Sequence, residues 1–147
     1  MLELGKHYGN GLQLVNILRD AHVDLSQGRC YFPREELQVV GMSPSEILQN
    51  PERFEPIYRR WLDEAEGGLK AGMKYVRAIN HFRVRGATAL PALIGARTIA
   101  LLRTAGRTAL EQKIKVPRKE VRAMIATVAI TLAGRQTLDE MFRRALR

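Results

Sequence analysis

The sequence has a single cysteine, Cys30, and only three histidines. One cysteine excludes an internal disulfide and is compatible with a reducing compartment. Because His7, His22 and His81 are scattered along the chain, no group of His and Cys residues has the spacing of zinc ligands. The sequence also lacks a Gly-rich phosphate loop and a nucleophile elbow. These absences exclude zinc-finger, P-loop and serine hydrolase sites.

Long apolar runs are absent as well. The long charge-free stretches, such as residues 86–96 and 123–134, are far shorter than the roughly 20 residues that a membrane span needs. The beginning of the sequence shows no secretory signal pattern. We therefore expect a cytoplasmic protein, and peripheral contact with a membrane stays open.

Aromatic residues are scarce, at 6% of the chain, whereas basic residues give a net charge of +9. The positive excess lies in residues 81–122, which contain ten basic and two acidic side chains. Since Phe82 is the only aromatic residue of that segment, stacking platforms for single strands are missing, and we expect no nucleic-acid partner. The basic segment can instead attract a diphosphate or an anionic lipid headgroup.

Helical periodicity covers almost the whole chain, and no alternating strand pattern occurs. The apolar spacing and the Pro and Gly residues predict helices over residues 2–25, 33–41, 51–80, 88–104 and 118–133. Ser43 and Glu46 have the spacing of a capping box, which predicts a helix start there. Gly67-Gly68 weakens the helical pattern of residues 51–80 without ending it, so we expect one long helix there. Pro91 is expected in the first turn of its helix. Beyond Gly134, Leu138, Met141 and Phe142 extend the apolar pattern of the last helix. The sequence predicts an all-α fold.

A polar stripe marks the first predicted helix. Gln13, Asn16, Asp20 and Asp24 follow one another at steps of three and four residues, which places them on one helix face. The residues between them are mostly apolar, so the other sides of the helix are expected to be buried. Two carboxylates four residues apart can bind one divalent cation, although the same spacing is common on solvated helix faces.

The residues around this stripe resemble the second aspartate-rich motif of the squalene/phytoene synthase family. Residues 16–20, Asp24 and residues 28–33 match it in type and order, and weaker similarity continues at Arg83, Arg85, Leu90-Pro91 and residues 95–97. The resemblance implies an isoprenoid-synthase-type helical bundle. Residues 1–147 would form one domain that corresponds to the C-terminal portion of that bundle.

The resemblance also assigns site residues. In the family, the Asn and both Asp bind magnesium ions that hold the substrate diphosphate, which makes Asn16, Asp20 and Asp24 the expected metal ligands. By the same resemblance, the diphosphate-binding residues are Gln13, Asn16, Arg19 and Arg29, and the catalytic residues are Asp20, Asp24 and Tyr31. Lys113 and Lys115, ahead of the last helix, are further candidates to reach the diphosphate.

The implied activity is a Mg²⁺-dependent prenyl transfer that joins two prenyl diphosphates head to head and releases diphosphate. Oxygen ligands suit Mg²⁺, and the metal neutralises the charge that develops on the leaving group. The sequence does not decide between farnesyl and geranylgeranyl diphosphate as the substrate. It also does not decide between a squalene-type or hopanoid precursor and phytoene as the product, or whether NADPH is used.

Two departures from the family pattern bear on this expectation. This chain has His22 and Val23 where most members have a small residue and a Glu, so we expect weakened or altered metal binding. The first aspartate-rich motif has no counterpart, since residues 1–12 contain no Asp. The alternatives are a non-catalytic family member that acts in assembly or interaction, or an inactive fragment. If the chain belongs to an enzyme, a homo-oligomer or a complementing N-terminal half would complete the site.

Overall fold

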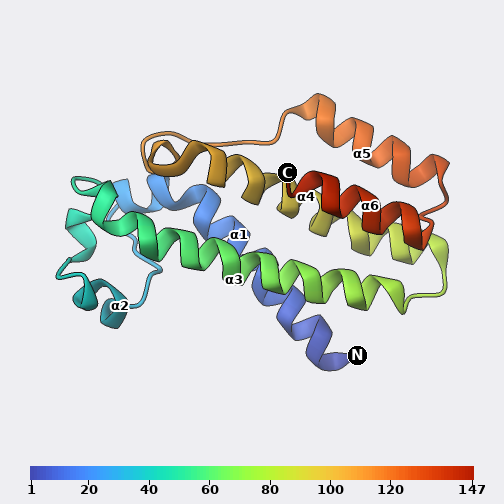
Figure 1. Cartoon of the computed structure of the whole chain (residues 1–147), viewed down its shortest axis with the longest axis horizontal. Helices are drawn as coiled ribbons and strands as arrows, with labels where there is room; N and C mark the ends of the chain where they lie inside the picture. Colours follow the sequence, from blue (N-terminus) through green and yellow to red (C-terminus); the bar gives the residue numbers. More distant parts are fainter.

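The computed structural model describes residues 1–147 as helices joined by short turns, with no strand, which confirms the all-α class. The long helices α1, α3 and α4 lie side by side, α2 lies at one end, and α5 and α6 cover α4 (Figure 1). The elements in chain order are α1 (Leu2–Ser26), α2 (Arg34–Val39), the 3₁₀ turn η1 (Pro44–Glu46), α3 (Pro51–Arg77), α4 (Phe82–Ala105), the 3₁₀ turn η2 (Gly106–Leu110), α5 (Arg118–Ile130) and α6 (Arg135–Ala145).

Helices α1 and α3 cross at glycine residues, which have no side chain. A Cβ atom on Gly11 would lie 2.7 Å from the Cα of Gly68, and one on Gly72 would lie 2.2 Å from the ring of Tyr8. Glycine at these positions lets the two backbones approach and leaves room for the Tyr8 ring. The single helix predicted over residues 51–80 is confirmed, because α3 runs unbroken through Gly67 and Gly68, and Gly68 serves the helix crossing.

Two buried tyrosines hold α1 against its neighbours. The Tyr8 hydroxyl donates to the carbonyl oxygen of Thr88 at 2.7 Å, and the Tyr58 hydroxyl donates to that of Leu18 at 2.9 Å. Burial raises the pKa of Tyr8 to about 12, so its phenol stays protonated and remains a donor. Both bonds fix the position of the helix that carries the polar stripe.

Helix α4 begins at Phe82, earlier than the predicted residue 88, and Pro91 therefore lies inside the helix. The buried guanidinium of Arg85 accounts for this start. Its Nε donates to the carbonyl oxygen of Ala133 at 2.7 Å, and its Nη1 donates to two carbonyl oxygens of the α3–α4 turn, including that of Asn80 at 3.0 Å. Tertiary hydrogen bonds thus support the first turns, and the exposed ring of Pro91 is accommodated further along.

The helix predicted over residues 118–133 is α5, and the apolar residues beyond Gly134 form a separate helix, α6. α5 ends at Ile130 because Leu132 and Ala133 adopt φ values of 48° and 51°, and the chain then turns back into the separate helix α6. The apolar residues of α5 are only partly covered by the core. Only Val128 is buried, whereas Ile125 is 47% exposed. α5 is the outermost helix in Figure 1.

The core is one cluster of 29 buried residues to which every long helix contributes. From α1 it takes Val15, Leu18 and Ala21, which directs the polar stripe of that helix away from the core. None of the helices is long and apolar enough to cross a membrane.

Candidate functional site

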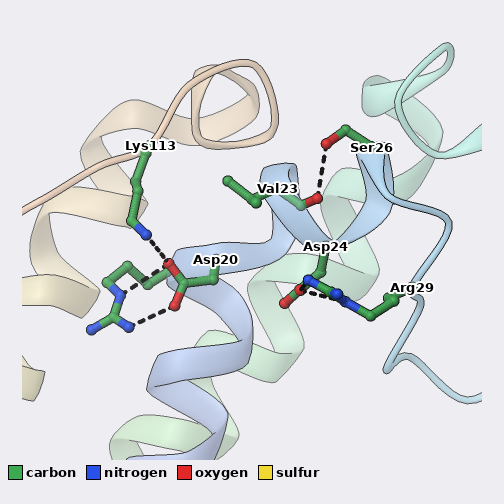
Figure 2. A network of polar contacts seen from close by, with 7 residues as sticks. Asp20, Val23, Asp24, Ser26, Arg29 and Lys113 are labelled. Carbon is green, nitrogen blue, oxygen red and sulfur yellow. Dashed lines mark hydrogen bonds and ion pairs between the residues drawn. The ribbon is translucent and has the colours of Figure 1, made fainter.

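The polar stripe lies along the outer side of α1. Gln13 and Asn16 are exposed, whereas the Asp20 and Asp24 side chains are only 25% and 17% exposed. Figure 2 shows that Asp20 points toward the connection between η2 and α5, and that Asp24 lies beside Arg29 from the turn that follows α1. The two carboxylates therefore lie on one helix but contact different partners.

The carboxylate of Asp20 is bound by two basic side chains. The Nη2 of Arg19 donates to Oδ2 at 2.6 Å, its Nε donates to Oδ1 at 3.3 Å, and the Nζ of Lys113 lies 2.7 Å from Oδ1. Hydrogen bonding to Arg19, with a further contribution from Lys113, holds the pKa of Asp20 below its usual range. The carboxylate is thus fully ionised at neutral pH.

Asp24 has one basic partner. The Nε and Nη2 of Arg29 donate to its Oδ1 at 3.0 and 2.8 Å. Gly28 makes this contact possible, since its φ of 75° reverses the chain and brings Arg29 back beside the end of α1. The hydroxyl of Ser26 donates to the carbonyl oxygen of Val23 at 2.8 Å and satisfies the last turn of the helix.

The chemistry of these side chains suits a hard divalent cation. Asp20 and Asp24 supply ionised oxygen donors on adjacent turns, and Asn16 adds an amide oxygen one turn earlier. No group of three or more His, Cys, Asp or Glu side chains is placed to hold a metal ion. The donor set fits a cation that is also bound by a second charged group. To bind that cation, each carboxylate would have to give up its contacts with the basic side chains.

Gln13 lines a hollow between α1, α2 and α3 with a volume of about 510 Å³. One wall is fixed by Trp61, whose Nε1 donates to Oε2 of Glu36 at 2.7 Å. Of the stripe residues, only Gln13 reaches this hollow. Tyr31 is 56% exposed in the turn after α1, and Lys115 is exposed beyond Lys113. Neither forms a hydrogen bond or an ion pair with Asp20, whose partners are Arg19 and Lys113.

His22 makes a structural contact between distant parts of the chain. Its Nδ1 lies 2.8 Å from the carbonyl oxygen of Leu110, which requires the proton to be on Nδ1 because a carbonyl oxygen only accepts. The bond joins α1 to the end of η2. Nothing in the sequence points to Leu110 as the partner of His22.

Comparison with known proteins gives a consistent result. Residues 1–120 match the family model described as Squalene/phytoene synthase. A presqualene diphosphate synthase of Zymomonas mobilis is 39% identical over 122 residues, which cover 81% of this chain and 38% of that protein. A phytoene synthase of Mycobacterium tuberculosis is 30% identical over 129 residues, covering 83% of this chain and 41% of that protein. The chain thus spans about two fifths of the length of these relatives.

Proposed function

Because this chain belongs to the squalene/phytoene synthase family, we propose that it provides the second metal-binding helix of a Mg²⁺-dependent prenyltransferase. The reaction would condense two prenyl diphosphates, farnesyl or geranylgeranyl, head to head with release of diphosphate. The observation that carries the proposal is α1 itself, with ionised Asp20 and Asp24 on adjacent turns and three basic side chains around them. These are the groups that a magnesium diphosphate needs.

Each side chain has a role that follows from its chemistry. Asp20, Asp24 and Asn16 would hold Mg²⁺, which when bound neutralises charge on the departing diphosphate. Arg19 and Arg29 now donate to Asp20 and Asp24, and with those carboxylates bound to a cation the two guanidinium groups would be free to donate to diphosphate oxygens. A planar guanidinium binds phosphate oxygens in pairs, which orients the leaving group.

The test is magnesium-dependent release of diphosphate from farnesyl and geranylgeranyl diphosphate, with and without NADPH. Since the chain spans 38% of the Zymomonas relative, it is assayed alone and after co-expression with the part of that relative outside the match. We expect Mg²⁺-dependent release in the complemented form, and product analysis then assigns the chain length and the use of NADPH. Turnover by the chain alone, with a dimer in size-exclusion chromatography, would assign completion of the site to a second copy. No release and no substrate binding in either form would instead indicate a non-catalytic family member.

We further propose that α5 contacts anionic membranes. Arg118, Lys119 and Arg122 are exposed on its first half, and Ile125 and Ile130 are exposed on its second half, with Ile130 at 81%. Basic side chains beside exposed apolar ones are what an anionic lipid surface attracts. The lipid character of the proposed substrates is compatible with such contact.

Ile130→Glu tests this surface. The substitution removes apolar area from the contact and adds a negative charge, so binding to phosphatidylglycerol vesicles should weaken about tenfold in co-sedimentation. Val39→Glu makes the same change on α2, where the valine is 87% exposed, and should leave binding unchanged. If both variants and the parent chain bound the vesicles equally well, the proposed membrane contact of α5 would be wrong.

A further inference from the structure

Lys113 comes from the far end of the matched region to reach the polar stripe. It lies in the connection between η2 and α5, and its Nζ is 2.7 Å from Oδ1 of Asp20 (Figure 2). The other partner of this carboxylate, Arg19, is its neighbour in sequence, whereas Lys113 is brought there only by the fold. Its side chain is 40% exposed, so the contact is open to solvent and to ligands.

The position of Lys113 is fixed by a second contact a few residues earlier. His22 on α1 binds the carbonyl oxygen of Leu110 at 2.8 Å, and the Leu110 side chain is buried in the core. The end of η2 is therefore held on α1 at two levels, by the His22 ring and by the hydrophobic core. Lys113 follows within a short stretch of chain and has few ways to move out of reach of Asp20.

We propose that Lys113 is a positioning residue that acts as an internal counter-ion of Asp20 in the cation-free chain and passes to the diphosphate when a divalent cation binds. The inference rests on the proposed function, because it needs a cation at Asp20. Lys113 and the cation compete for the same oxygen, so the lysine weakens binding of the cation alone. A bound diphosphate offers the released ammonium group a new partner, so the lysine strengthens binding of the cation together with diphosphate.

This exchange predicts that one substitution changes the affinity for the cation and the affinity for diphosphate in opposite directions. Lys113→Met should bind Mn²⁺ alone about fivefold more tightly than the parent chain, because Asp20 loses a competing cation. The same variant should bind inorganic pyrophosphate in the presence of Mn²⁺ about fivefold more weakly, because one phosphate-binding cation is gone. A lysine that only stabilised the fold would not separate the two affinities in this way.

The experiment measures both affinities by isothermal titration on the whole chain, with Mn²⁺ and inorganic pyrophosphate as probes. Lys70→Met is the matched control, since Lys70 forms a comparable ion pair with Glu66 on α3 at 2.6 Å, and neither affinity should change in it. Thermal unfolding of both variants is the check that they are folded. His22→Gln should weaken pyrophosphate binding in the same direction as Lys113→Met, because it loosens the η2 contact.

The outcomes separate this inference from the proposed function. Mn²⁺ binding that depends on Asp20 but is the same in the parent chain and in Lys113→Met overturns the inference and leaves the proposed function standing. Tighter Mn²⁺ binding together with unchanged or tighter pyrophosphate binding overturns the transfer to diphosphate. Absence of Mn²⁺ binding in the parent chain and in Lys113→Met overturns both.

Discussion

Asp20→Asn and Asp24→Asn should each reduce magnesium-dependent diphosphate release by about 100-fold or more. Asparagine keeps the size of the side chain but removes the charge that binds the cation. It also leaves Arg19, Lys113 and Arg29 without the carboxylates that they now contact. Steady-state release of diphosphate in the complemented form measures the effect.

Asp63→Asn is the control for the loss of one carboxylate. Asp63 is 72% exposed and pairs with Arg103, away from the polar stripe. An exposed ion pair contributes little to stability, so this variant should keep the parent rate. If either stripe variant retained the parent rate within about threefold while remaining folded, the metal role of that carboxylate would be wrong.

Gly68→Ala should lower the free energy of unfolding by about 2–3 kcal/mol, whereas the neighbouring Gly67→Ala should raise it by about 0.5–1 kcal/mol. A Cβ on Gly68 would lie 2.5 Å from the Cα of Gly11, and no side-chain rotation relieves a contact with backbone. A Cβ on Gly67 meets nothing within 4 Å. There the substitution only reduces the freedom of the unfolded chain.

Thermal unfolding compares the two variants directly. For a chain of this length we expect the midpoint to fall by about 5–10 °C in Gly68→Ala and to rise by about 2–3 °C in Gly67→Ala. Because the two substitutions are chemically identical and adjacent, propensity alone would give them the same sign. Equal midpoints would contradict the close α1–α3 crossing that positions the polar stripe.

The features that could be predicted from the sequence are local ones. The first helix was predicted over residues 2–25 and extends over Leu2–Ser26, because its apolar period is unbroken and Gly28 follows in a left-handed conformation. The capping box at Ser43 and Glu46 is present, with the Ser43 N–H donating to the Glu46 carboxylate at 2.7 Å. Each of these signals is contained within one or two helical turns.

The features that could not be predicted depend on distant residues. The start of α4 is supported by Arg85 through the carbonyl of Ala133, a partner beyond α5 that no local pattern reveals. Gly68 only weakens the helical pattern of α3 in the sequence, and its place in the helix crossing depends on Gly11, which lies on another helix. The residues of the candidate stripe were chosen by pattern, but the contact of Lys113 with Asp20 exists only in the folded chain.

The measurement that tests the central claim most directly is isothermal titration of the chain with inorganic pyrophosphate, in the presence and absence of Mg²⁺. The account predicts binding that requires Mg²⁺ and is lost in Asp24→Asn, since α1 would hold the cation and Arg19 and Arg29 would hold the anion. Pyrophosphate binding of equal strength without Mg²⁺, or equal binding in Asp24→Asn, would contradict it. Such a result would mean that the basic side chains act alone and that α1 is not a metal-binding helix.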